Sequence, residues 1–136
     1  MSFIVTDNEK AVQDALYRGD YLQAFLLVHA VIESLLRASL HITDSDVRFH
    51  GLIQEYKQFL EEQSPGVTTF VEELKQFNRR RNRIVHELWI RGYTHTNRLA
   101  EEAAQAAVLM YGLFIEFLQT FDPELSEKGF RYDKDS

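Results

Sequence analysis

The chain has 136 residues, of which 45% are hydrophobic and 12% aromatic, as expected for one globular domain with an ordinary apolar core. Its net charge of −6 argues against a broad cationic surface for duplex DNA, although a local basic site is compatible with it. Because there is no cysteine, disulfides, thiolate metal ligands and a cysteine nucleophile are excluded.

The N-terminal residues, from Met1 to Asp7, contain no basic segment followed by a long apolar run, so we expect no secretory signal. The most apolar stretch, residues 24–32, is interrupted by His29 and followed by Glu33. It is expected to be too short and too polar to cross a bilayer. We therefore expect a soluble, cytoplasmic protein with no membrane partner.

Two helices are predicted in the first third of the chain. Thr6-Asp7-Asn8-Glu9 has the spacing of a capping box, which predicts a short helix that ends at Gly19. Asp20 can cap the next helix, predicted from about Tyr21 to His41. This second helix is apolar on more than one face, which is typical of a helix at the centre of a bundle or in an oligomer interface.

Three further helices are predicted, and their ranges are 46–62, 67–90 and 97–121. Gly92 is expected to end the second of these three, and Thr94 or Thr96 to cap the last. Since no segment alternates with a period of two, we predict an all-α protein, an up-and-down bundle of four to five helices. The bundle is expected to be a single domain over residues 1–121, with a charged C-terminal tail at 122–136.

The helix predicted at 67–90 breaks its own apolar pattern. At about 100° per residue, its apolar side chains share one stripe about 100° wide, formed by Val67, Phe70, Leu74, Phe77, Ile84, Val85 and Leu88. Arg81 lies near the centre of that stripe. A guanidinium stays charged, and an unpaired buried charge costs several kcal/mol or more. Either Arg81 has a partner, or this face lines a cleft and not a dry core.

Asn82 and His86 lie four residues apart and share a second face of the same helix, with Arg79 and Arg83 as neighbours. Glu33 on the preceding long helix is the expected internal partner of Arg81 or His86. A lone histidine on a bundle helix is more often structural, and a run of arginines is more often a solvated face. Here the two occur together in a helix that departs from its packing pattern, which is typical of a functional site.

The segment Arg81-Asn82-Arg83-Ile84-Val85-His86 resembles the motif of HEPN domains (higher eukaryote and prokaryote nucleotide-binding). In that motif an arginine and a polar residue, often asparagine, precede a histidine late in a bundle helix. The segment Glu33-Ser34-Leu35-Leu36-Arg37-Ala38-Ser39-Leu40 is similar to the second helix of the family. The resemblance covers roughly residues 8–121.

The resemblance implies a bundle that dimerises so that the two motif helices face each other across a cleft. Many members are metal-independent endoribonucleases with toxin or defence roles, whereas others bind nucleotides or have no known catalysis. One subgroup has a tyrosine two positions after the motif histidine, which a partner nucleotidyltransferase modifies. This chain has Leu88 there, so that partnership is in doubt.

On this basis the expected catalytic residues are Arg81, Asn82 and His86, and the expected substrate-binding residues are Arg79, Arg80 and Arg83. Glu33 is expected to support them. No metal and no other cofactor is expected. The expected partners are a second copy of the chain, RNA or a nucleotide, and an antitoxin protein.

Metal-free RNA cleavage needs a base for the 2'-hydroxyl, an acid for the leaving 5'-oxygen, and cations for the phosphorane. Histidine can serve as acid or base, and a two-fold dimer would supply a second His86. The leading prediction is therefore an endoribonuclease that forms 2',3'-cyclic phosphates. One alternative is a non-catalytic HEPN module that binds a nucleotide, RNA or a partner protein. Another is a helical adaptor whose arginines only form salt bridges.

Two aromatic residues and one histidine near these segments are assigned structural roles. His29 lies in an apolar stretch and is expected to be a satisfied core or interface residue. Trp89 and Tyr93 follow the motif. Both could stack on a base, but packing is their expected role.

Overall fold

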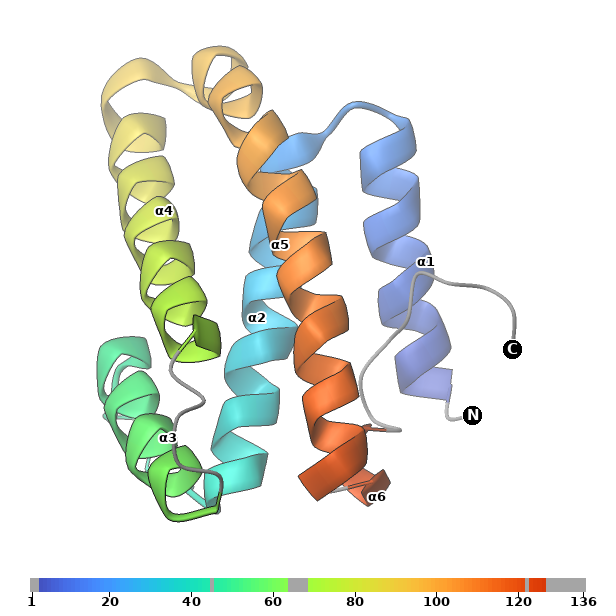
Figure 1. Cartoon of the computed structure of the whole chain (residues 1–136). Coiled ribbons are helices and arrows are strands. Elements are labelled where there is room, and N and C mark those ends of the chain that lie inside the picture. The colour runs from blue at the N-terminus through green and yellow to red at the C-terminus, as the bar shows by residue number, and fades with distance from the viewer. Residues whose placement is uncertain (1–2, 45, 64–68, 122, 127–136) are drawn as a thin grey trace.

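The computed structural model describes residues 3–44, 46–63, 69–121 and 123–126. Within these ranges the regular elements are all helices and there is no strand, which confirms the predicted all-α class (Figure 1). The helices are α1 (Phe3–Tyr17), α2 (Tyr21–Leu40), α3 (Phe49–Gln63), α4 (Thr69–Arg91), α5 (Tyr93–Phe121) and α6 (Pro123–Ser126).

Helices α2 and α5 pack against each other at the centre of the bundle (Figure 1). α1 packs on α2, and α4 packs on α5 at the other side. α3 lies beside the N-terminal half of α4 and also contacts α2, so the C-terminal half of α4 extends beyond it. The central place of α2 agrees with its apolar residues on more than one face.

The core is continuous and rich in aromatic side chains. The largest fully buried ones are Phe25, Tyr56, Phe77, Tyr111 and Phe114. Phe25 and Phe77 bring α2 and α4 into contact, with 5.2 Å between their ring centroids. Tyr56 of α3 meets Phe114 of α5 edge to face at 5.8 Å. Aromatic pairs of this geometry stabilise by about 0.5–1.5 kcal/mol beyond the area that they bury.

The turn between α1 and α2 is held by a side chain from α5. Gly19 has a φ of 75°, which lets the chain reverse after α1. Asn97 donates through Nδ2 to the carbonyl oxygen of Gly19 at 2.8 Å and accepts from the backbone N–H of Leu22 at 2.9 Å. Asp20 is the N-cap residue of α2, as predicted, but its side chain forms no capping hydrogen bond, and its carboxylate accepts from the Tyr93 hydroxyl instead.

Replacing Asn97 with alanine is expected to lower the free energy of unfolding by about 2 kcal/mol, because two hydrogen bonds are lost and two backbone groups are left without this partner. Gln105→Ala, at an exposed position of the same helix, is the matched control and should change it little. Urea unfolding followed by circular dichroism measures both variants. Equal stability of the two would contradict this role of Asn97.

Two predicted helix starts in the first half of the chain are wrong. α1 begins at Phe3, so Thr6 lies inside the helix and is not its N-cap. α3 begins at Phe49, later than the predicted residue 46, because the segment before it is held by contacts described below. In the predicted tail, Pro123–Ser126 forms the short helix α6, and residues 122 and 127–136 lie outside the described residues.

The connection between α4 and α5 is shorter than predicted. Gly92, with a φ of 83°, is the only residue between Arg91 and Tyr93, where α5 begins. Thr94 and Thr96 therefore lie inside α5 and do not cap it. The Thr96 hydroxyl donates to the carbonyl oxygen of Gly92 at 2.8 Å, one turn back along the chain. A glycine that adopts positive φ without steric cost lets the second helix start at once.

Two segments of the described chain, Tyr21–Leu40 and Tyr93–Thr120, are long and apolar enough to cross a membrane by length and composition. The stretch 24–32, expected to be too short and too polar for a bilayer, lies within the first of these longer segments, and its expected place outside a membrane stays a prediction. Both segments supply the core of the bundle, and core helices of soluble proteins meet the same criteria. Length and hydropathy are therefore weak evidence for a membrane here.

Candidate functional site

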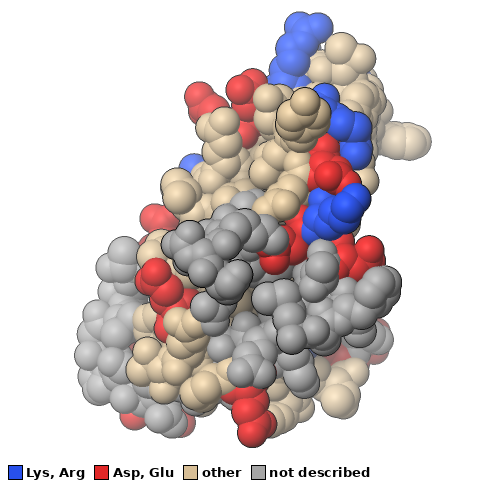
Figure 2. All heavy atoms as spheres, turned by 90° about the vertical axis from the view of Figure 1, so that its right-hand side faces the viewer, with Lys and Arg blue, Asp and Glu red and all other residues tan. Residues whose placement is uncertain are grey.

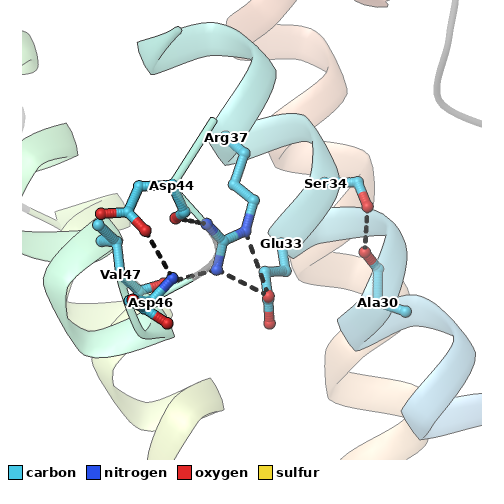
Figure 3. Close-up of polar contacts among 7 residues, drawn as sticks. All are labelled: Ala30, Glu33, Ser34, Arg37, Asp44, Asp46 and Val47. Carbon is cyan, nitrogen blue, oxygen red and sulfur yellow. Dashed lines mark hydrogen bonds and ion pairs between the residues drawn. The ribbon is translucent and has the colours of Figure 1, made fainter. Parts of the chain in front are cut away.

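Arg37 ties the end of α2 to the start of α3 (Figure 3). Its guanidinium pairs with Glu33, with 3.3 Å between Nη2 and Oε2, and Nη1 donates to the carbonyl oxygen of Asp44 at 2.9 Å. Nη2 also donates to the carbonyl oxygen of Val47. Asp44 in turn accepts from the backbone N–H of Asp46 at 2.9 Å. These contacts hold the residues just before α3 against α2.

The prediction that Glu33 pairs with Arg81 or His86 is wrong for the described residues, because its ion pair is with Arg37. The four-residue spacing places Arg37 on the same face of α2 as Glu33, so this partner is available from local structure alone. Glu33 nevertheless lines the same cleft as Arg81. Its carboxylate therefore contributes negative charge to that cleft without contacting Arg81.

Arg81 is exposed although Phe77 and Ile84, its neighbours on the same stripe of α4, are buried. It lies on a polar cleft of about 490 Å³, which we call the Arg81 cleft. The cleft is lined by His29, Glu33, Arg37, Val47, Arg48, Phe49, His50, Asn78, Arg81 and Asn82. Of the two alternatives for Arg81, the structure shows the one in which this face of the helix lines a cleft.

Asn82 is the hydrogen-bond partner of Arg81 in the described part of the chain. Nη1 of Arg81 donates to Oδ1 of Asn82, with 3.3 Å between the two atoms. Both side chains are exposed, so this contact holds the guanidinium only weakly in place. The remaining donors of the guanidinium can therefore bind a ligand with fixed, fork-like geometry.

His86 is exposed on α4 and does not line the Arg81 cleft. It follows Arg81 by five residues, which corresponds to about 7.5 Å along the helix axis. Residues that follow one another at spacings of three and four form one outward surface of α4, which we call the motif stripe. It consists of Asn78, Arg81, Asn82, Val85, His86 and Trp89.

Trp89 ends the motif stripe, and its side chain is 89% exposed. The expectation that it packs within the bundle is therefore wrong. Val85 and Ile90 beside it are also exposed, so the C-terminal half of α4 presents apolar surface next to His86. Tyr93 is half exposed, so it packs less than predicted, and its hydroxyl donates to Asp20.

The four arginines of the segment 79–83 do not form one cluster in the structure. Arg80 and Arg83 border a separate hollow of about 140 Å³ on the α5 side of α4, together with Glu102. Arg79 is exposed and lines neither hollow. The structure therefore does not bring the three predicted substrate-binding arginines together with Arg81, because consecutive residues of a helix point in different directions.

His29 lies where α2 meets the Arg81 cleft. Its side chain is 6% exposed, and its ring packs on Phe49 and Phe77 with centroid distances of 4.5 and 5.0 Å. Burial was predicted, but its Nε2 has no hydrogen-bond partner among the described residues, so it is not a satisfied core histidine. Burial, together with the smaller effect of the positive charge of Arg81, lowers the pKa of His29 to about 4.

Because the pKa of His29 is lowered, we predict that the free energy of unfolding depends on pH. Between pH 6.5, its ordinary pKa, and about 4, the unfolded chain binds a proton at this residue that the folded chain does not bind. The free energy of unfolding should therefore fall by about 3 kcal/mol from this residue alone as the pH is lowered from 7 to 4. Below that range the loss is complete.

Comparison with His29→Leu isolates this effect, because the other ionisable groups on the cleft are the same in both proteins, namely Glu33, Arg37, Arg48, His50 and Arg81. Urea unfolding at several pH values gives the two stability curves. The difference between wild type and variant should rise with pH between 4 and 6.5. Parallel curves would show that His29 is not held neutral in the folded protein.

Among the described residues, the α1 side of the molecule shows no extended basic surface (Figure 2). Asp and Glu side chains are spread over the described part of this face, and most of its Lys and Arg side chains gather at its upper right (Figure 2). The Arg81 cleft lies elsewhere, between α2, the start of α3 and α4.

Two findings concern ligands and relatives. Among the described residues, no group of three or more His, Asp or Glu side chains is arranged to hold a metal ion. No protein family model, curated protein or solved structure matches the chain. The resemblance to HEPN domains therefore stays a prediction that depends on the motif residues and on α2.

Proposed function

We propose that this protein is a metal-independent endoribonuclease of HEPN type whose active site forms between two copies of the chain. The observation that carries the proposal is the position of Arg81. It occupies a core position of α4 by helical periodicity, yet it is exposed on a polar cleft beside Asn82 and near His86. A guanidinium at such a position is suited to a phosphate, with which it can form two parallel hydrogen bonds.

The roles of the motif residues follow from their chemistry. Arg81 stabilises the negative charge that develops on the phosphate in the transition state. His86 transfers a proton to or from the reacting oxygens. Asn82 orients the guanidinium through its hydrogen bond to Arg81. A reaction that needs both an acid and a base is served by two histidines, one from each subunit.

The apolar end of the motif stripe supports the dimer in this proposal. Val85, Trp89 and Ile90 expose apolar surface directly beside His86. Exposed patches of this kind mark interaction surfaces, and aromatic residues at their centre contribute much of the binding energy. A two-fold axis through this surface would place each motif stripe opposite its counterpart, with two His86 side chains near one seam.

RNA cleavage by the purified protein in the presence of EDTA tests this proposal. We expect products that end in a 2',3'-cyclic phosphate, formed at the same rate with and without the chelator. Activity that EDTA abolishes, or the absence of cleavage of any single-stranded RNA, would overturn it. Induced expression in a bacterial host should arrest growth if the protein is a toxin, and a cognate antitoxin protein would relieve the arrest.

A non-catalytic HEPN module is the second candidate function. It is favoured by one observation, namely that His86 lies outside the Arg81 cleft of its own subunit. Such a module would bind a nucleotide, RNA or a partner protein without turnover. Tight binding of RNA together with unchanged RNA after long incubation would favour it over the nuclease.

A further inference from the structure

The outward face of α5 carries an apolar patch in the middle of the helix, which we call the α5 patch. Leu109 is 73% exposed and Leu113 is 53% exposed, and the exposed Gly112 lies between them. Spacings of three and four residues after Leu109 place the other two on the same face. In Figure 1, α5 lies in front of α2, so the side of α5 away from α2 is turned toward the viewer. The α5 patch is no part of the motif stripe or of the Arg81 cleft, so the pairing proposed above does not use it.

Gly112 indicates how the α5 patch is covered. It lies in the interior of a 29-residue helix, where glycine lowers helix stability relative to alanine. A Cβ atom at this position would meet nothing within 4 Å, and the residue does not have a positive φ. Neither packing within the subunit nor the backbone conformation therefore requires glycine here. On an outer helix face, glycine lets the backbone of a second helix approach closely between the flanking side chains.

The end of the α5 patch toward the N-terminus of α5 is bordered by arginines. Arg80 and Arg83 lie on the α5 side of α4 and border a hollow together with Glu102. Arg98 is exposed on α5, one turn before Glu102. None of the three arginines forms an ion pair in the part of the chain that the structure describes. Three arginines against Glu101 and Glu102 leave this end with a net positive charge.

The opposite end of the α5 patch is acidic. Glu116 is exposed and follows Leu113 by three residues, so it continues the same face of the helix. After Arg98, α5 contains no further lysine or arginine. An apolar patch with one basic and one acidic end is complementary to a second copy of itself in the antiparallel direction, because each basic end then meets an acidic end.

We propose that the α5 patch binds the same patch of a second copy of the chain, with the two α5 helices antiparallel and crossing beside Gly112. A two-fold axis midway between Leu109 and Leu113 packs each of these leucines on the other kind from the partner. Glu116 of each copy then lies opposite position 106 of the other, one turn from the hollow that Arg80 borders. This contact does not depend on the nuclease, and together with the pairing at the motif stripe it links dimers into larger assemblies.

Sedimentation velocity of the full chain over a range of concentrations tests the inference. The α5 patch contains no aromatic residue, so we expect its contact to be about 100-fold or more weaker than the pairing at Trp89. The wild type should form dimers first and larger species as the concentration rises toward about 1 mM. Leu113→Asp should remove only the larger species. Tyr17→Asp changes an exposed aromatic residue on α1 and is the matched control, which should leave them in place.

Gly112→Leu distinguishes a close helix crossing from general apolar association. Leucine adds exposed apolar surface, so association that depends on apolar area alone would become stronger. At a close crossing there is no room for the side chain, and the α5 contact should weaken about tenfold or more. Within the subunit a side chain at this position meets no neighbour, so urea unfolding should show that the variant is at least as stable as the wild type.

A charge exchange tests the antiparallel arrangement. Arg80→Glu and Glu116→Arg should each weaken the α5 contact about fivefold, since each affects two exposed ion pairs related by the two-fold axis. The double variant should regain most of the affinity, because the charges are exchanged and still opposite. A double variant no tighter than either single variant would overturn the arrangement, and so would stronger association of Gly112→Leu.

Trp89→Asp separates failure of this inference from failure of the proposed function. The variant should still form a dimer at high concentration, and adding Leu113→Asp should leave only monomers. A Trp89→Asp protein that stays monomeric up to about 1 mM, or a dimer of it that Leu113→Asp does not weaken, would overturn the inference. If the pairing at Trp89 does not exist, the wild type reaches only a dimer, which Leu113→Asp removes and Trp89→Asp leaves. That result would refute the shared active site and support the α5 contact.

Discussion

Replacing His86 with alanine is expected to slow RNA cleavage about 1,000-fold, because a residue that transfers protons in the transition state contributes about 10²–10⁴-fold to the rate. The side chain is exposed, so its removal should leave the fold and the free energy of unfolding unchanged. Single-turnover cleavage of a labelled RNA measures the rate, and circular dichroism with urea unfolding measures the stability.

His95→Ala is the matched control for this experiment. His95 lies on α5 and is about half exposed, with 3.4 Å between its Nε2 and a carboxylate oxygen of Glu87. Its removal should not affect cleavage. Arg81→Lys should slow the reaction strongly although the charge is kept, because lysine cannot form two parallel hydrogen bonds to a phosphate. Full activity in His86→Ala would contradict the catalytic role of the motif.

Replacing Trp89 with aspartate is expected to weaken the dimer by about 100-fold or more and to abolish cleavage at concentrations where the variant is monomeric. A central aromatic residue of an interface contributes about 2 kcal/mol or more, and two like charges at a two-fold seam add repulsion. The unfolding of the subunit itself should change little, because Trp89 is 89% exposed within it.

Tyr17→Asp is the matched control, since Tyr17 is 94% exposed and lies on α1. Sedimentation velocity over a range of concentrations gives the dimer affinity of each variant, and cleavage is measured at the same concentrations. The account requires that affinity and activity fall together in Trp89→Asp and that both persist in Tyr17→Asp. Full activity of a monomeric Trp89→Asp protein would show that the active site is complete within one subunit.

The sequence was sufficient to predict the five long helices α1 to α5, because each has a strong apolar period or a clear terminator. The apolar faces of α2 predicted its central position, and Gly19 and Gly92 mark the ends of two helices. The helix starts were less predictable. Thr6 and Asp20 both have the chemistry of an N-cap, but α1 begins before Thr6 and the carboxylate of Asp20 bonds to Tyr93.

The candidate site was predictable only as far as one helix determines it. The conflict between the charge of Arg81 and its core position predicted either a partner for the guanidinium or a cleft, and the structure shows a cleft. Glu33 pairs with Arg37, four residues later on the same helix. Such a local partner competes with any partner on another helix. His29 lines the cleft because the start of α3 packs beside it, and such tertiary packing could not be predicted from the sequence. The only indication in the sequence was a polar residue within an apolar run.

The distance between the two copies of position 86 tests the central claim most directly. Because the chain has no cysteine, His86→Cys introduces a single site for a spin label, and Tyr17→Cys provides a matched site on α1. Pulsed dipolar spectroscopy of each labelled protein then reports the separation between subunits. We expect the two labels at position 86 to lie closer together than those at position 17. No dipolar coupling at position 86, or a longer separation there than at position 17, would contradict an active site shared by two subunits.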